Sequence, residues 1–513
     1  MEYMPNAIVK NVLACLVLVI LCIVIGAEVA ESKEVSVGII AALVGGSFML
    51  WLGARCWVLI FLVPPVMALL PLPGKLGTIP VSFLVGLVVL VYWFIMWGMG
   101  YVRFRWRSLL ALDFVVAVLF LYMVISYIRN PVSMAVFGWE TDYVGGKEYV
   151  FCILAVLFYI AMSCIPCSHE QVVRVLRWCV RLCIITCFVT IGMALSGYVG
   201  AATDLHEAAT GGRFSMFLLL GMYGIYILYG QYPMSRVLLS PGIFVGCVLS
   251  CIAILLSGWR EQMLASAIIT IALAHIKREL WCLTLIFLGI YGALLYLSKE
   301  EMLDDWPYGI QRCISILPGV EVSDKVEANA GHSSEWRVEM WKWAVDPRTG
   351  YIRDYVWGDG FGISVDFMRR ETTAMMRQGA GYNLREQFAV TGVWHNGGIT
   401  TVHRLGFVGL GLVTLVFVTN VWVILRVCHA LRGTPMYLPS LFLILPYVAQ
   451  PVVFYVSAGT LIKFFNDFVY IAMAKFFYCE AREQGLLMPL FCRQHYIPLA
   501  IQAHEERIRP AEP

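Results

Sequence analysis

A series of apolar segments, each about as long as a lipid bilayer is thick, runs through this chain of 513 residues. A helix that crosses the hydrocarbon core of a bilayer needs roughly 20 apolar residues. Segments of about that length recur along the sequence, and we predict that each of them is a membrane-spanning helix. They cover residues 10–28, 36–53, 56–72, 80–101, 109–128, 148–166, 178–199, 214–231, 237–257, 260–276, 280–297, 404–425, 437–455 and 458–479. We expect the first segment to stay in the membrane rather than to be cleaved as a signal peptide.

The composition agrees with a membrane protein. Hydrophobic residues make up 60% of the chain and charged residues only 14%, whereas soluble domains carry about 45–50% apolar and about 25% charged residues. A soluble enzyme and a disordered protein are therefore poor matches, and the net charge of +3 is too small for a protein that binds nucleic acid. Most of the 16 cysteines lie in apolar segments, where a thiol packs as a small hydrophobe. We predict an all-α fold, a polytopic transmembrane helical bundle of about 12–14 spans with one large, partly helical loop.

Basic residues are concentrated in four of the short connections between the predicted spans. They are Arg103, Arg105 and Arg107; Arg174 and Arg177; Lys277 and Arg278; and Arg426 and Arg432. Cytoplasmic connections carry an excess of Lys and Arg. Because the predicted spans put all four connections on one side, we assign that side, together with both termini, to the cytoplasm. The long hydrophilic segment then lies on the opposite face, which is the periplasm of a cell with two membranes.

This topology divides the chain into four parts. Residues 1–297 form an N-terminal transmembrane bundle of about eleven spans, and residues 298–403 form the large periplasmic loop. Residues 404–479 form the C-terminal spans, and residues 480–513 form a cytoplasmic tail. A loop outside the cytoplasm has no access to ATP or to nucleotide sugars. Any substrate of the loop must therefore arrive already activated, most plausibly on a membrane carrier.

The large loop has a helical pattern of its own. One face of the segment 335–344 is apolar except for a single arginine, and its members are Arg337, Met340, Trp341 and Ala344. We place the start of this helix after Ser333 and Ser334. An amphipathic helix with tryptophan and basic residues often lies on the membrane surface. The same helix would also suit a lid over a site at that surface, and both interpretations stay open.

Three arginines are predicted to lie at the outer membrane face. Arg213 opens one span, Arg260 stands between two closely spaced spans, and Arg337 belongs to the loop helix. A guanidinium group matches phosphate oxygens bidentately and keeps its charge. A cluster of such groups would suit a lipid-linked diphosphate and would stabilise the charge that develops when the diphosphate leaves. The alternatives are an ion pair between Arg260 and Glu261 and ordinary positions among lipid head groups.

His395 adds a group that titrates near neutrality. Beside a substrate hydroxyl it would act as a general base, and the neighbouring Asn396 would orient the imidazole ring or the substrate. A lone histidine is, however, more often structural. Asp113 and Asp467 lie within apolar segments and would suit the proton relay of a transporter, although an ion pair with Lys463 also accounts for Asp467.

Motifs of other enzyme classes are missing from the sequence. It contains no HExxH zinc motif, no Walker A motif and no GxSxG nucleophile motif. The adjacent carboxylates Asp304 and Asp305 follow a predicted span, but they belong to an acidic stretch that is typical of an exposed surface. We therefore expect no metal ion and no cofactor.

Several local strings are similar to those of the O-antigen ligase and O-antigen polymerase superfamily, whose members are polytopic GT-C-type glycosyltransferases of the bacterial inner membrane. In chain order they are Gly211–Phe214, Leu255–Arg260, Arg337 with Met340, Trp341 and Ala344, Gly358–Gly362, and His395–Asn396 followed by Leu405–Gly409. The overall layout, with one large periplasmic loop before the last few spans, resembles that of the family as well.

The resemblance implies a metal-independent transfer of a glycan from undecaprenyl diphosphate to an acceptor hydroxyl at the periplasmic face. Arg260 and Arg337 would hold the diphosphate, and His395 would activate the acceptor. Arg213 would help to bind the donor or the acceptor, and Trp341 and Asn396 would belong to the substrate site. The acceptor would be a glycan, a lipid or a protein, so both ligase and polymerase remain open. A transporter or flippase of polysaccharide or lipid-linked oligosaccharide is the alternative outside the enzyme class.

The predicted topology can be tested with reporter proteins fused at two positions. Alkaline phosphatase joined after residue 350 should be active, because that position is expected outside the cytoplasm. The same reporter joined after residue 435 should be silent, and a fluorescent protein that matures only in the cytoplasm should give the reverse pattern. Phosphatase activity at the second position would contradict the topology.

Overall fold

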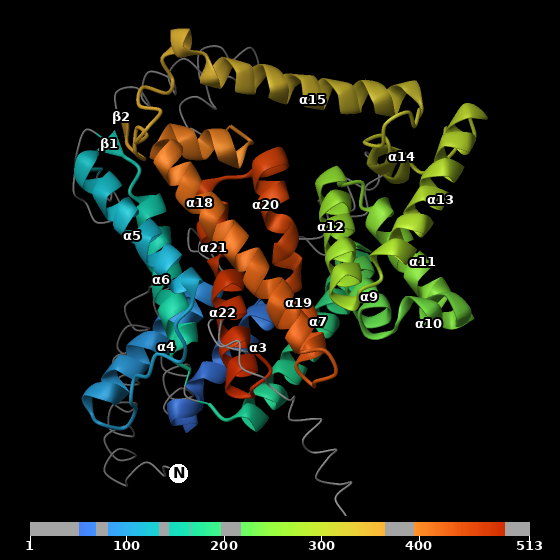
Figure 1. Cartoon of the computed structure of the whole chain (residues 1–513). Helices are drawn as coiled ribbons and strands as arrows, with labels where there is room; N and C mark the ends of the chain where they lie inside the picture. Colours follow the sequence, from blue (N-terminus) through green and yellow to red (C-terminus); the bar gives the residue numbers. More distant parts are fainter. Residues whose placement is uncertain are drawn as a thin grey trace, which may run out of the picture.

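The computed structural model describes residues 51–67, 81–132, 143–165, 167–195, 217–364 and 394–487. Within these ranges the regular structure is helical, apart from strands β1 (Tyr143–Val144) and β2 (Ile363–Ser364), which pair antiparallel. Most helices stand side by side, and one long helix crosses the upper end of the bundle in Figure 1. The predicted all-α helical fold is therefore confirmed for the described residues.

The elements fall into three groups along the chain. The first comprises η1 (Gly53–Trp57), α3 (Val58–Met67), α4 (Val81–Gly98), α5 (Ala111–Arg129), α6 (Lys147–Ser163), α7 (His169–Leu195), α9 (Phe217–Gln231), α10 (Met234–Leu239), α11 (Pro241–Leu256), α12 (Arg260–Lys277) and α13 (Leu280–Lys299). The second, within the predicted large loop, comprises α14 (Tyr308–Ile314), α15 (Asp324–Val345) and η4 (Pro347–Thr349). The third comprises α18 (Gly397–Ala430), α19 (Tyr437–Leu443), η6 (Leu445–Ala449), α20 (Gln450–Val453), the π-helix η7 (Phe454–Ala458), α21 (Leu461–Asn466) and α22 (Phe468–Glu483).

Three helices of the described residues are long and apolar enough to cross a membrane. They are α5, α13 and α18, and α19 with the segment 445–456 makes a fourth candidate that is bent by 44°. Shorter apolar helices cover Gly53–Pro65, Ser82–Gly98, Phe217–Gln231 and Pro241–Leu256. The described residues thus fit a membrane protein but contain far fewer full-length spans than the sequence suggests. The predicted span at residues 10–28 lies outside them.

Helix α18 contains a sharp kink at Gly406, whose backbone dihedrals are φ 64° and ψ −173°. This conformation is almost confined to glycine, and a Cβ atom at this position would collide with the carbonyl group of Val356. The kink leaves backbone groups of α18 without hydrogen-bond partners inside the helix, and backbone groups of another segment take their place. Phe407 donates its amide hydrogen to the carbonyl oxygen of Tyr355 (2.8 Å), and Val408 donates to that of Val356 (3.2 Å).

The replacement partners belong to residues 354–360, which we call the strap. On the other side of the kink, Asp359 donates its amide hydrogen to the carbonyl oxygen of His403 (2.9 Å), and Gly360 donates to that of Arg404 (3.0 Å). The hydroxyl group of Tyr122 in α5 donates to the carbonyl oxygen of Leu405 (2.7 Å). The strap, which includes the start of the glycine-rich string Gly358–Gly362, therefore supplies the backbone partners that the kink in α18 needs.

Most of the basic connections meet at one end of the bundle. Arg107 donates to both carboxylate oxygens of Glu483 at the end of α22 (2.7 and 3.0 Å). Gln484 donates to the Nδ1 atom of His169 at the start of α7 (2.7 Å). Arg432, which follows α18, donates to the carbonyl oxygen near the end of α12 (3.1 Å). The connections that the charge pattern places on one membrane side are thus neighbours in space.

A buried ion pair lies close to this end. The ammonium group of Lys475, whose side chain is fully buried, contacts a carboxylate oxygen of Asp113 at 2.6 Å. The other carboxylate oxygen accepts a hydrogen bond from the hydroxyl group of Tyr159 (2.6 Å), and the carboxylate also caps α5 by accepting from the amide of Leu110 (2.7 Å). These contacts give Asp113 a structural role in joining three helices.

Removing the positive partner of this pair should destabilise the protein strongly. Lys475→Met leaves the carboxylate of Asp113 in a poorly hydrated site without its cation, and such losses cost about 3–5 kcal/mol. The matched control is Arg348→Met, which removes the exposed partner of Asp346 and should leave the unfolding midpoint unchanged. Thermal unfolding in detergent measures both variants, and equal midpoints for Lys475→Met and the wild type would contradict the assignment.

Candidate functional site

Helix α15 crosses the end of the bundle that lies away from the basic connections, above α18 at one end and near α14 at the other (Figure 1). The predicted helical face is used for packing. Met340 and Ala344 are fully buried and form a small cluster with Trp394. The indole of Trp341 donates to the carbonyl oxygen of Trp394 (2.9 Å). The apolar stripe therefore fastens α15 to the segment that leads into α18.

The boundaries of this helix differ from the prediction. We placed its start after Ser333 and Ser334, whereas α15 begins at Asp324, so these serines lie inside the helix rather than at its cap. The segment 324–334 is polar, and polar residues give no periodic signal of a buried face. The sequence also predicts a second helix in the loop, over residues 366–378, and these residues lie outside the described ranges.

His395 adopts an unusual backbone conformation directly before α18. Its φ angle is +48°, a left-handed value that is uncommon for residues other than glycine. Its imidazole lies 6.1 Å from the ring of Trp336, measured between ring centroids. The next residue, Asn396, is the N-cap of α18, because its side-chain oxygen accepts a hydrogen bond from the amide of Ile399 (3.1 Å). The predicted role of Asn396 in binding substrate thus competes with a structural role.

Two charged side chains from other helices act on His395. Burial and the positive charge of Arg337 lower the pKa of the imidazole below its usual value, while the negative charge of Glu261 opposes that effect. The lowered pKa favours the neutral ring, which is able to accept a proton. The sequence singled out Arg337 and His395 but read Glu261 only as a partner of Arg260.

Arg260 and Glu261 are the first two residues of α12. The chain reaches them through a tight turn at Gly258, whose φ angle is +69°, and the hydroxyl group of Ser257 donates to the carbonyl oxygen of Ile254 (2.6 Å). These features end α11 and start α12 within a few residues. The sequence prediction of two closely spaced helices that meet at Arg260 is confirmed.

Helix α14 brings a further arginine to this region. Cys313 in α14 lies within electrostatic range of Arg260, although burial dominates and raises the pKa of its thiol to about 12. The preceding residue, Arg312, has two buried guanidinium nitrogens, Nε and Nη1, that form no hydrogen bond within the described part of the chain. Sequence reasoning missed Arg312, because nothing around it in the loop forms a recognisable motif.

The structure therefore unites part of the predicted site. Arg337, Trp341, His395 and Asn396 lie together at the junction of α15 and α18, and Glu261 connects this junction to the start of α12. Arg213 lies outside the described residues. Within the described ranges, no group of three or more His, Cys, Asp or Glu side chains is arranged to hold a metal ion.

Comparisons with known proteins add no assignment. No family model matches the chain, and no curated protein matches it. Clues to function therefore come from the chemistry of the residues described above.

The electrostatic surroundings of His395 can be tested by titration. Arg337→Gln removes a repulsive charge and should raise the pKa of the imidazole, whereas Glu261→Gln removes an attractive charge and should lower it further. NMR spectra of protein with 13C-labelled histidine follow the titration, with His395→Asn used to assign the resonance. Arg348→Gln in the exposed turn after α15 is the control and should leave the pKa unchanged. Shifts of the same sign in both test variants would contradict this arrangement.

Proposed function

We propose that this chain is a membrane glycosyltransferase of the O-antigen ligase or polymerase type. It would transfer a glycan from an undecaprenyl-diphosphate donor to an acceptor hydroxyl. The observation that carries the proposal is the position of His395, which follows the Trp394 anchor of α15 and lies within electrostatic range of both Arg337 and Glu261, at the end of the bundle away from the basic connections. A general base beside fixed cations is the combination that such a transfer requires.

The arginines would bind the diphosphate of the donor. Arg260 and Arg337 reach this end from α12 and α15, and a guanidinium group binds phosphate oxygens through two parallel hydrogen bonds. The unpartnered nitrogens of Arg312 supply further donors in the neighbouring helix α14. Arg213 would add a contact to the donor or the acceptor. Together these groups would stabilise the negative charge on the departing diphosphate.

The reaction then needs one proton transfer and one displacement at carbon. His395 accepts the proton of the acceptor hydroxyl while the hydroxyl oxygen forms a bond to the anomeric carbon of the donor glycan. The bond between that carbon and the diphosphate oxygen breaks, and undecaprenyl diphosphate leaves with the electron pair. Glu261 stabilises the imidazolium that forms, because its charge favours the protonated ring.

The proposed setting is the bacterial inner membrane, with the site facing the periplasm. The basic connections, which gather at the other end of the bundle, support an outward position of the site. The acceptor would be a second lipid-linked glycan in a polymerase, or a lipid or protein in a ligase. Other membrane lipids would surround the site on the outer side of the spans.

A transporter or flippase is the competing proposal. It would use ionisable residues inside the membrane, and Asp113 and Asp467 are the residues of that kind that the sequence highlights. The carboxylate of Asp113 is engaged by Lys475 and by the cap of α5. That of Asp467 accepts a hydrogen bond from Gln450. Both carboxylates therefore have structural partners, which favours the glycosyltransferase over the transporter.

The decisive variant is His395→Asn, which tolerates the left-handed backbone while removing the base. In a host that lacks the native gene, it should reduce glycan transfer by roughly 10²–10⁴-fold, the usual contribution of a general base. Arg260→Lys keeps the charge but loses the guanidinium geometry and should cost about 10²-fold. Gel analysis of envelope glycans measures transfer, and immunoblots of membranes confirm that each variant is inserted.

Matched controls change the same residue types elsewhere. His169→Asn, at the opposite end of the bundle, and Arg348→Lys, in an exposed turn, should retain full transfer. Loss of long glycan chains on deletion of the gene identifies a polymerase, and accumulation of full-length lipid-linked polymer identifies a ligase. Normal transfer by His395→Asn would show that His395 has no role in the mechanism. If vesicles that contain the protein transport lipid-linked glycan and form no new glycosidic bond, the protein is a transporter and not an enzyme.

A further inference from the structure

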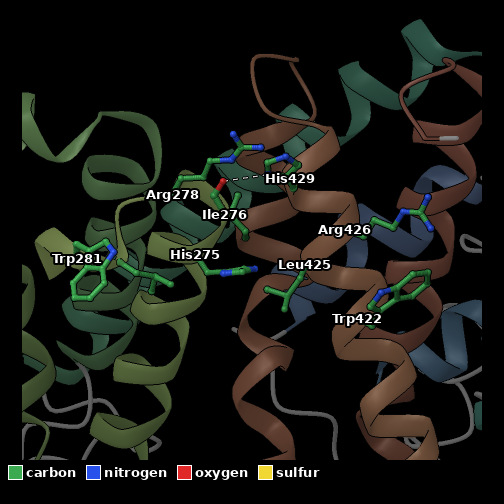
Figure 2. Close-up of a pocket in the computed structure, with 9 residues that line it drawn as sticks. His275, Ile276, Arg278, Trp281, Trp422, Leu425, Arg426 and His429 are labelled. Atoms are coloured by element: carbon green, nitrogen blue, oxygen red, sulfur yellow. Dashed lines mark hydrogen bonds between the residues drawn. The ribbon is translucent and has the colours of Figure 1, made fainter. Parts of the chain in front are cut away.

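A cavity of about 600 Å³ lies at the other end of α12 and α18, far from His395. Its wall is formed by the end of α12, the start of α13 and the last turns of α18 (Figure 2). The polar and aromatic lining residues are His275, Arg278, Trp281, Trp422, Arg426 and His429. Helix α12 has 18 residues and rises about 1.5 Å per residue, so its two ends, where the two sites lie, are about 27 Å apart. This distance is close to the roughly 30 Å thickness of a hydrocarbon core.

The cavity lies where two candidate membrane spans end. Helix α13 begins at Leu280 and α18 ends at Ala430, and both helices are apolar enough to cross a bilayer. Trp281 is 84% exposed and Trp422 is 41% exposed. Tryptophan is enriched where helices pass from hydrocarbon to head groups. The lining of the cavity is therefore at the level of the lipid head groups.

The lining is positively charged. Arg278 and Arg426 are guanidinium groups from opposite walls, and Arg426 also lies over the ring of Trp422, 5.1 Å from its centroid. None of the described lining residues is acidic. The nearby carboxylate of Glu279 is neutralised by Lys277 at 3.1 Å. The described lining of the cavity therefore carries two arginines and no carboxylate.

The two histidines of the lining differ in their contacts, because one joins two helices and the other is exposed. His429 donates through Nδ1 to the carbonyl oxygen of Ile276 (3.2 Å), which ties α18 to the end of α12 (Figure 2). The side chain of His275 is exposed on the α12 side of the cavity. Imidazole and guanidinium nitrogens are both suitable hydrogen-bond donors to phosphate oxygens.

Apolar side chains extend from the cavity along the lipid-facing helices. On α18, Leu415 is 48% exposed and Val418 is 60% exposed, whereas on α13 Leu285 is 68% exposed. Only 6% of the α13 span is buried within the protein. A lipid whose phosphate group lies in the cavity would therefore find apolar surface for its acyl chains beside it. A free phosphate ion would make no contact with that surface.

We propose that this cavity binds the phosphate head group of an anionic phospholipid in the leaflet opposite the candidate catalytic site. Arg278 and Arg426 hold the phosphate, and the acyl chains lie along α13 and α18. Basic pockets between transmembrane helices bind anionic lipids in this way. The bound lipid joins the helix group that contains α12 and α13 to the group that contains α18. The proposal is independent of glycosyl transfer.

The test compares lipid binding by the purified protein and by the double variant Arg278→Asn, Arg426→Gln. Asparagine is chosen because Arg278 has a φ angle of +63°, which asparagine tolerates. Phosphatidylglycerol should raise the thermal unfolding midpoint of the wild type and give adducts with one lipid in native mass spectrometry. The double variant should bind this lipid at least tenfold more weakly. Arg236→Gln, a basic residue of α10 that lies over Tyr232, is the matched control.

Several outcomes would overturn the proposal. Equal stabilisation by phosphatidylcholine would show that the head-group charge is irrelevant, and the full effect from inorganic phosphate would replace the lipid by a soluble anion. Unchanged affinity in the double variant would remove the arginines from the site. If the double variant fails to fold, a photoactivatable phosphatidylglycerol on the wild type decides the question. Crosslinks should fall within residues 275–285 and 415–429, and crosslinks confined elsewhere would refute the site.

Discussion

The hydrogen bond between the indole of Trp341 and the carbonyl oxygen of Trp394 holds the candidate site together. Trp394 is fully buried, its indole donates to Nδ1 of His403 (3.1 Å), and its amide donates to the hydroxyl group of Thr400 (3.3 Å). One residue thus fixes helix α15 on the start of α18 and immediately precedes His395. Because the cluster around Trp394 is separate from the main core, the position of α15, and with it Arg337, relative to His395 depends on this small set of contacts.

The periodic features of the sequence were the ones that predicted structure well. The apolar segments anticipated helices, the spacing of Met340 and Ala344 anticipated the buried face of α15, and the string around Arg260 anticipated the junction of α11 and α12. The approach of Glu261 to His395 could not be predicted, because it depends on how helices distant in sequence pack. Arg312 was missed for the same reason. The predicted number of spans stays a prediction, because the described residues contain three helices of full spanning length and one further candidate that is bent between α19 and η6.

The two cationic regions share helices α12 and α18 but differ in their counter-charges. At the start of α12, Glu261 lies within electrostatic range of His395, so the candidate catalytic site includes a negative charge. At the other end of α12, Glu279 forms an ion pair with Lys277, and the described lining of the cavity contains arginines but no acidic residue. A site that must release a diphosphate benefits from balanced charge, whereas a site that retains a lipid benefits from an excess of cations. If both proposals hold, one pair of helices serves glycan transfer at one end and lipid binding at the other.

The strap across the kink of α18 has a consequence for how this region opens. Backbone groups on both sides of Gly406 are paired with residues 354–360 rather than with their own helix. Tyr122 also donates to the carbonyl oxygen of Trp357 (2.9 Å), so α5 holds the strap and the kinked helix at once. If the strap loses these hydrogen bonds, the kinked part of α18 loses them too. The two segments should therefore exchange their amide hydrogens as one cooperative unit. Thermal fluctuation would then open the strap and the kink of α18 in a single concerted event rather than by gradual fraying.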